Sequence, residues 1–175
     1  MRDIESMRAS DVMISPVLTV KMRDSIHDVA SLFVDKNISG SVVLDDDGKE
    51  IGVITKTDLA RYDRERLNLL TRERDSRNLV TAGTNEAIGK NSGFHLEAEE
   101  ETIESWFSPT IYTLPSEATL LEVTNELLKR KIHHLFIKDE DMGKVAGVIT
   151  TFDLVGYLSH YLLRGPKRRK QQVGS

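Results

Sequence analysis

Two threonine–aspartate pairs, each with two residues between its members, have the side-chain types and spacing to do chemistry. Thr55 and Asp58 belong to the run Gly52-Val-Ile-Thr-Lys-Thr-Asp-Leu, and Thr150 and Asp153 belong to Gly147-Val-Ile-Thr-Thr-Phe-Asp-Leu. A carboxylate accepts hydrogen bonds from neighbouring sugar hydroxyls, while a threonine hydroxyl and the free N–H groups of a helix start can face a phosphate. The pairs therefore predict two sites for a sugar with an attached anion.

The same spacing also fits a purely structural role. A threonine before the first turn of a helix, with an acid three residues later, is close to a capping pair that satisfies the free backbone groups at a helix start. Both roles can coexist in one residue, so the spacing alone leaves the alternatives open.

The two runs belong to a longer internal repeat. Their glycines and aspartates are offset by 95 residues (147 − 52 and 153 − 58). Upstream, Ser15-Pro16 faces Ser108-Pro109, and the possible capping pair Ser25-x-x-Asp28 faces Thr119-x-x-Glu122, if one inserted residue accommodates the change of register. An internal repeat of this kind predicts two copies of one supersecondary unit.

Each copy is predicted to contain a strand, a helix, two strands joined by a hairpin, and a second helix. The expected strands cover residues 17–20, 41–44 and 51–54 in the first copy, and residues 110–114, 135–137 and 145–149 in the second. Helices are expected to start at Ser25 and Thr119 and again directly after each third strand. Apolar stripes on the last helices include Leu59 and Tyr62 in the first copy, and Leu154, Val155, Leu158, Tyr161 and Leu162 in the second.

This sequence resembles the cystathionine-β-synthase (CBS) domain family through three runs: Val12-Met-Ile-Ser-Pro16, Ile38-Ser-Gly-Ser-Val-Val, and Gly52 to Asp58. The resemblance implies an α/β (α+β) fold, in which two pseudo-twofold-related β-α-β-β-α repeats pack as one module. It also implies two clefts that hold AMP, ADP, ATP or S-adenosylmethionine, frequent homodimerisation, and regulation of an attached or separate enzyme. The expected boundaries are residues 8–62 for the first repeat, 63–102 for a charged helical extension and linker, 103–162 for the second repeat, and 163–175 for a basic tail.

The resemblance makes Thr55, Asp58, Thr150 and Asp153 the expected ligand contacts. The second copy departs from the pattern, because it begins Ser105-Trp-Phe-Ser-Pro109 and carries His133 and His134 where the first copy has Ser39 and Gly40. We therefore expect unequal clefts. One histidine is a candidate donor to a phosphate, with ordinary packing as the alternative. Ser39 and Gly40 are further candidates, with a turn role as the alternative for Gly40. By position alone, Ile38, Ile132, Val17, Ile111 and Ile54 are also candidates, although a simple core role is the plainer interpretation of each.

Composition restricts the class of protein. The chain has no cysteine, a net charge of −4, and no apolar run near the roughly 20 residues that span a bilayer. We expect a cytoplasmic protein with no membrane segment and no metal. Nucleophile, phosphate-loop and metalloprotease motifs are absent from the sequence, so we expect no catalysis and no required cofactor.

Two segments remain outside the repeats. Residues 61–77 are expected to prolong a helix with Leu67, Leu69 and Leu70 partly covered, residues 83–93 to form a loop, and residues 97–101 an acidic turn that is solvated or docks a partner. The leading hypothesis is an adenosine-ligand sensor acting in trans on an unknown partner enzyme, transporter or regulator. The alternatives are a scaffolding dimer without ligand, or a nucleic-acid-associated regulator using the basic run Lys167-Arg-Arg-Lys170, although the acidic body makes nucleic acid the less favoured partner.

Overall fold

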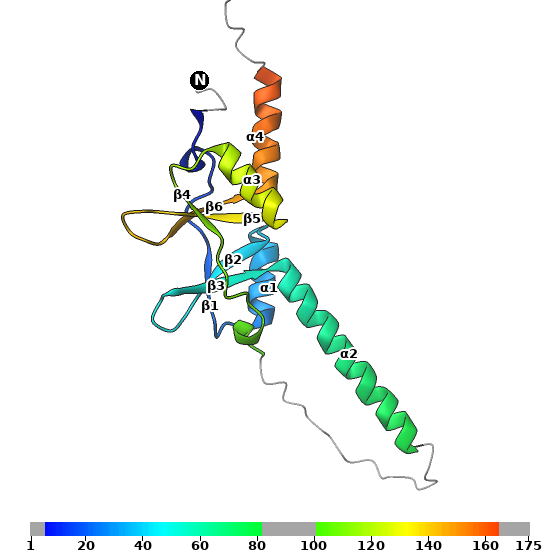
Figure 1. Ribbon diagram of the computed structural model, residues 1–175. Helices are drawn as coiled ribbons and strands as arrows, with labels where there is room; N and C mark the ends of the chain where they lie inside the picture. Colours follow the sequence, from blue (N-terminus) through cyan, green and yellow to red (C-terminus); the bar gives the residue numbers. More distant parts are fainter. Residues whose placement is uncertain (1–5, 82–100, 165–175) are drawn as a thin grey trace, which may run out of the picture. The chain divides into compact units, whose positions relative to one another are not determined.

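The computed structural model describes residues 6–81 and 101–164, which form a mixed α+β fold with two three-stranded sheets (Figure 1). The chain divides into two units. One combines residues 1–17 with residues 112–175, and the other contains residues 18–111. Each unit thus holds one complete copy of the repeat.

The first repeat contains β1 (Thr19–Lys21), α1 (Ile26–Asp35), β2 (Gly40–Leu44), β3 (Glu50–Thr55) and α2 (Lys56–Thr81). Strand β2 lies in the middle of its sheet, parallel to β1 and antiparallel to β3. The core of this unit is formed by apolar side chains of both helices and the sheet, among them Val29, Phe33, Val43, Ile54, Leu59 and Tyr62.

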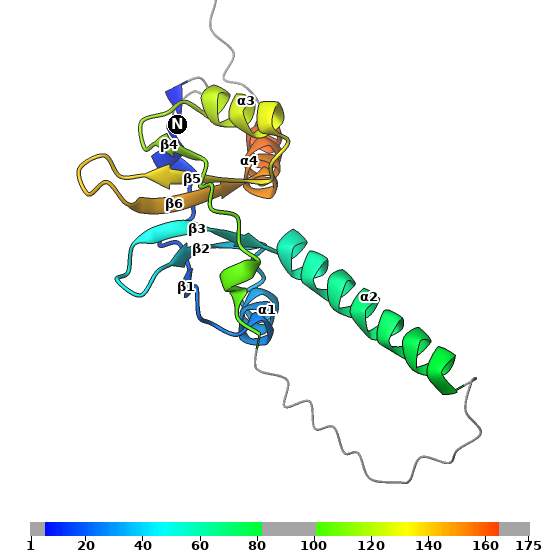
Figure 2. The same cartoon turned by 60° about the horizontal axis from the view of Figure 1, so that its bottom comes forward.

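The second repeat contains β4 (Thr113–Pro115), α3 (Leu120–Arg130), β5 (His134–Lys138), β6 (Val145–Thr150) and α4 (Thr151–Arg164) (Figure 2). Its sheet has the same order and the same strand directions, with β5 in the middle. Val123, Leu127, Leu135, Ile137 and Ile149 form the centre of its core. The predicted order of elements is therefore confirmed in both copies.

Sheet registers show where the two copies differ in length. Thr19 pairs with Val42 and Thr113 pairs with Phe136, so the first two strands of the copies are 94 residues apart in the sequence. Leu44 pairs with Glu50 and Lys138 pairs with Val145, so the third strands, after the hairpin, are 95 residues apart. The inserted residue lies in the second hairpin turn.

Upstream of the strands, the prediction was wrong by one residue. Ile14 bridges Val148 of β6, and Ser108 bridges Val53 of β3, so Ile14 corresponds to Ser108. Matching Ser15-Pro16 with Ser108-Pro109 put the prolines in register instead. A Ser-Pro dipeptide recurs easily, while backbone pairing to a strand defines the position.

The segment ahead of each repeat packs on the other repeat. We call residues 6–17 and 101–111 the leaders. The first leader contains the 3₁₀ turn Ala9–Asp11 and belongs to the unit of the second repeat, where Ala9 is fully buried. The second leader contains the turn Ile103–Ser105, and Ile103 is fully buried in the core of the first repeat.

Two glycines allow the leaders to approach the edge strands closely. A Cβ at Gly147 would overlap the side chain of Met13, and a Cβ at Gly52 would overlap the Phe107 ring and the Ser108 carbonyl oxygen. Both glycines stand at the same position of β6 and β3. Close backbone approach explains why the runs begin with glycine.

Exposure of α2 differs from the expectation. Leu67, Leu69 and Leu70 of α2 were expected to be partly covered, but 64%, 61% and 51% of their surfaces are exposed. The α4 stripe is also largely uncovered. Periodicity finds an apolar face without showing what covers it. The expected loop at residues 83–93, residues 97–100 of the expected acidic turn and the basic run at residues 167–170 lie outside the described residues.

Candidate ligand-binding junctions

Each threonine–aspartate pair lies where the last strand of a repeat passes directly into a helix. At the β6–α4 junction, the backbone N–H and hydroxyl of Thr150 both donate to Oδ2 of Asp153, at 2.8 and 2.6 Å, and the Asp153 N–H donates back to Thr150 Oγ1 at 3.2 Å. At the β3–α2 junction, Thr55 and Asp58 make the same three bonds, at 2.9, 2.7 and 3.4 Å. Both pairs are therefore helix caps.

A further threonine–acid pair, away from the two junctions, forms the same cap where no ligand contact is expected. Thr119 and Glu122 at the start of α3 form the same reciprocal box, with 2.7 and 2.8 Å bonds to the carboxylate and 3.2 Å for the return bond. At the start of α1, Ser25 accepts from the Asp28 N–H at 3.4 Å without a closed box. Acid length does not explain that difference, because Asp58 and Asp153 close their boxes.

Capping occupies one oxygen of each aspartate and leaves the other in a different environment in each repeat. Oδ1 of Asp58 lies 3.4 Å from the Arg61 guanidinium, which also donates to the Trp106 carbonyl oxygen at 2.9 Å. In α4 the position of Arg61 is occupied by Gly156, and Oδ1 of Asp153 accepts no hydrogen bond from any described residue. Sequence reasoning missed Arg61, although its i, i+3 spacing from Asp58 was a usable signal.

The residues before the middle strands reach the same junctions through the backbone. The N–H of Lys56 donates to the Ser39 carbonyl oxygen at 3.0 Å, as the N–H of Thr151 donates to the His133 carbonyl oxygen at 3.2 Å. Gly40 pairs with Thr55, and His134 pairs with Thr150. The structure therefore brings His133 and His134 to the second junction, at the positions that Ser39 and Gly40 occupy at the first.

The two histidines differ in environment. His133 is exposed, whereas His134 is half-buried. Burial lowers the pKa of His134 below its usual value, and the neighbouring His133 lowers it further, while the Asp153 carboxylate acts in the opposite direction. A lowered pKa favours neutral His134 at neutral pH, in which form one ring nitrogen donates and the other accepts.

The apolar candidates fall into two groups. Ile54 is fully buried in the core of the first repeat, so it offers no surface to a ligand. Ile38 and Ile132 are half-buried after α1 and α3, where each donates its N–H to a helix carbonyl, at 3.0 and 3.1 Å. Val17 and Ile111 are half-buried at the ends of the leaders.

Two negative findings apply to residues 6–81 and 101–164. No group of three or more histidine, cysteine, aspartate or glutamate side chains there is arranged to hold a metal ion. Within the same ranges, no helix is both long enough and apolar enough to cross a membrane.

Comparison with known proteins identifies the family. The family model described as the CBS domain matches residues 9–65 and 103–160, one match for each repeat. The chain therefore belongs to the CBS domain family, as a tandem pair.

Individual relatives are distant. An uncharacterized protein, MJ1426, of Methanocaldococcus jannaschii is 25% identical over 161 residues, which cover 86% of this chain and 90% of that protein. The crystal structure of the CBS domain pair of protein MJ0100, in complex with 5′-methylthioadenosine and S-adenosyl-L-methionine, has a TM-score of 0.64 at 18% identity and covers 88% of this chain and 97% of its own. The structure of CBSX2 in complex with AMP has a TM-score of 0.60 at 21% identity, covering 87% and 96%. These similarities extend over nearly the whole of each chain.

Proposed function

We propose that this chain is a regulatory module that binds an adenosine-type ligand, such as AMP, ADP, ATP or S-adenosylmethionine, and passes the binding signal to a separate partner protein. It catalyses no reaction of its own and requires no cofactor in this proposal. Family membership and the adenosine compounds bound by MJ0100 and CBSX2 support the class of ligand. A cytoplasmic location is part of the proposal, as the sequence predicts.

The observation that carries the proposal is that the helix cap at the second junction uses only one of the two carboxylate oxygens of Asp153. Capping uses Oδ2 of Asp153 and leaves Oδ1 without a donor among the described residues. A carboxylate oxygen of a half-buried side chain is satisfied well by a hydroxyl donor. A ribose supplies two such hydroxyls, so capping and ligand binding use different atoms of one carboxylate.

The repeats are unequal in this respect, and we propose that the second junction is the primary ribose contact. Asp58 has Arg61 beside its second oxygen, and a ligand hydroxyl would compete with that ion pair. In α4, Gly156 stands at the position of Arg61, so no guanidinium competes there, and His134 lies at the same junction. His133, Ser39, Gly40, Ile38, Ile132, Val17 and Ile111 remain proposed contacts of lower priority.

Thermal unfolding with AMP, ADP, ATP, S-adenosylmethionine or 5′-methylthioadenosine added separately tests the proposal. A ligand at 100 times its dissociation constant stabilises the folded protein by about 2.7 kcal/mol. We expect at least one compound to raise the melting temperature of the wild type. No shift with any of them would support a scaffold that binds no adenosine ligand.

Asp153→Ala and Glu122→Ala form a matched pair that separates capping from binding. Each change removes the acid of one capping box, so each should cost about 0.5–2 kcal/mol of stability. Only Asp153→Ala should also abolish stabilisation by the ligand, and Asp58→Ala should weaken it less. Equal ligand responses in Asp153→Ala and Glu122→Ala would reduce Asp153 to a helix cap.

A further inference from the structure

Arg61 ties the first junction to the second leader. Its guanidinium lies 3.4 Å from Oδ1 of Asp58, donates to the Trp106 carbonyl oxygen at 2.9 Å, and stands over the Trp106 ring at 5.8 Å from the ring centroid. An ion pair between partly exposed side chains is weak by itself. The carbonyl oxygen and the ring add a charge-assisted hydrogen bond and a cation–π contact, so they hold the guanidinium beside the aspartate.

The second leader holds Trp106 in a fixed position. Trp106 donates its N–H to the Ile103 carbonyl oxygen at 2.9 Å, and its ring packs edge-on against the Tyr62 ring with centroids 5.1 Å apart. On one side Ile103 is fully buried in the core of the first repeat, and on the other the backbone of Ser108 pairs with β3. Arg61 therefore has a rigid partner in the leader.

These contacts leave the Asp58 carboxylate with little room for a ligand. Only 14% of the Asp58 side chain is exposed. The cap with Thr55 uses Oδ2, and the Arg61 guanidinium lies at Oδ1. To bond with Oδ1, a ribose hydroxyl would have to displace a guanidinium that Trp106 also binds.

The second junction has the same cap without this cover. Gly156 stands three residues after Asp153, as Arg61 stands three residues after Asp58. Gly156 is exposed, and a Cβ built there would meet no atom within 4 Å. The position therefore has space for a long side chain and carries none.

The first leader contains the counterpart of the Trp106 carbonyl group. Because Ile14 corresponds to Ser108, Val12 corresponds to Trp106, and both residues cap the C-terminal end of the 3₁₀ turn in their leader. Val12 has no ring to place under a guanidinium, but it has the same backbone carbonyl. Gly156→Arg would therefore meet the same two kinds of acceptor, an aspartate carboxylate and a leader carbonyl.

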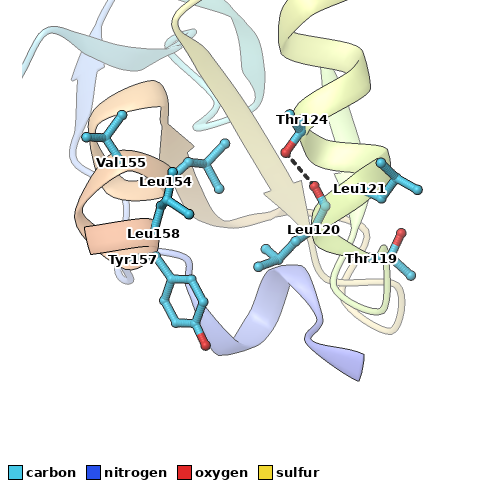
Figure 3. Close-up of a pocket in the computed structure, with 8 residues that line it drawn as sticks. All are labelled: Thr119, Leu120, Leu121, Thr124, Leu154, Val155, Tyr157 and Leu158. Carbon is cyan, nitrogen blue, oxygen red and sulfur yellow. Dashed lines mark hydrogen bonds between the residues drawn. The ribbon is translucent and has the colours of Figure 1, made fainter. Parts of the chain in front are cut away.

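The apolar groove between α3 and α4 is a separate surface (Figure 3). Its volume is about 530 Å³, and neither Asp153 nor Gly156 lines it. The α4 side chains that line it are Leu154, Val155, Tyr157 and Leu158. On the opposite wall the Thr124 hydroxyl donates to the Leu120 carbonyl oxygen at 2.7 Å, so it is already satisfied as a donor. The groove therefore offers a ribose little to bond with, and a substitution at position 156 leaves it unchanged.

From these contacts we propose that Arg61, held by the second leader, closes the first junction, so that each chain binds one ribose ligand, at the second junction. The closure matters only if an adenosine-type ligand binds through Asp153, so this proposal rests on the proposed function. Arg61 then sets the number of ligands, and the second leader acts as an autoinhibitory element. We expect the first junction to bind a ribose at least about tenfold more weakly than the second, a factor that corresponds to about 1.4 kcal/mol.

Titration calorimetry of the full chain with 5′-methylthioadenosine counts the bound ligands, and AMP serves as a second probe. 5′-Methylthioadenosine has both ribose hydroxyls and no charged group, so the charge of Arg61 neither attracts nor repels it. We expect one molecule per wild-type chain and two per Arg61→Ala chain, because that substitution uncovers Oδ1 of Asp58 and leaves the cap intact.

Two further variants locate the second molecule. Adding Asp58→Ala to Arg61→Ala should return the count to one, as expected if the second molecule lies at the first junction. Arg64→Ala is the matched control, because it removes an exposed arginine one turn further along α2. It should bind one molecule, like the wild type.

The reciprocal substitution moves the closing side chain to the second repeat. Gly156→Arg should bind neither probe at concentrations that saturate the wild type, and Gly156→Arg combined with Arg61→Ala should bind one molecule, at the first junction. Gly156→Gln, which adds a long side chain without charge, is the control and should still bind one. Because position 156 is exposed and open, circular dichroism should show all these variants folded.

The possible outcomes separate the closure from the proposed function. Two molecules per wild-type chain, one molecule per Arg61→Ala chain, or equal binding by Gly156→Arg and Gly156→Gln would overturn the closure by Arg61 and leave the proposed function standing. Binding of neither probe to any variant would overturn the proposed function together with the closure.

Discussion

Gly52 and Gly147 each leave room for a leader beside a strand, but the leader atoms that they face differ. The two positions should therefore differ in how much a substitution destabilises the fold. At Gly52 an added methyl group would overlap the Ser108 backbone carbonyl oxygen and the rigid Phe107 ring. Neither group can move aside by a small change of side-chain torsion. At Gly147 the neighbour is a methionine, whose flexible side chain adapts more readily. The two glycines are therefore unequal in tolerance.

We expect Gly52→Ala to be more destabilising than Gly147→Ala. Overpacking a filled site costs about 1–3 kcal/mol, and the upper part of that range applies where the backbone must move. Urea unfolding of both variants measures the difference. Gly156→Ala is the control for the added methyl group, because that site has open space within the chain. A larger loss in Gly147→Ala would mean that the first leader is the more rigid one.

At the scale of elements, the β3–α2 and β6–α4 junctions could be predicted from the sequence because their signals are local. Spacing of Thr55 and Asp58, and of Thr150 and Asp153, indicated a cap, and all the capping bonds fall within four consecutive residues. The Arg61 ion pair could have been found in the same way. The exposure of α4 could not, because an apolar stripe does not reveal whether its cover is another element or another chain.

The cap of α3 makes a prediction about acid stability. Hydrogen bonds from the backbone and side chain of Thr119 lower the pKa of Glu122 from 4.5. A lowered pKa in the folded state means that the carboxylate stabilises the fold above pH 4.5, and this contribution is lost as the pH falls through the folded-state pKa. Glutamine can fill the same capping position without titrating.

The free energies of unfolding of the wild type and Glu122→Gln should therefore differ most at neutral pH and converge below pH 4.5. Chemical denaturation at a series of pH values measures the gap between the two proteins. Glu117→Gln, at an exposed position before the helix, is the control. A gap that stays constant with pH would show that the Glu122 charge does not contribute to the cap.

At the scale of the whole molecule, the exchange of leaders was the feature that sequence could not provide. The repeat was visible in the sequence, and each leader was assigned to the repeat that follows it. In the structure, Ile103 is buried in the first repeat and Ala9 in the second. No local sequence pattern predicts which repeat a leader packs on, because the choice depends on which edge strand, β3 or β6, can pair with the backbone of the leader.

Because each repeat needs the leader of the other, neither half should fold alone. We expect a fragment of residues 1–90 and one of residues 91–175 to lack native unfolding transitions when separate, and to regain one when mixed. The first fragment lacks Ile103, and loss of a buried isoleucine costs about 2–5 kcal/mol even as a truncation to alanine. Circular dichroism melts of each fragment and of the mixture decide this. A cooperative melt of either fragment alone would contradict it.

The crossed leaders also have a consequence for descent. A half-length ancestor, carrying one leader and one copy of the fold, would have had its own strand edge vacant and an arm that fits the edge of a sister chain. Two such chains that exchanged leaders would form an intertwined dimer. Fusion of the two genes end to end would place both exchanged leaders in one chain. The tandem chain is then a covalently linked arm-exchanged pair.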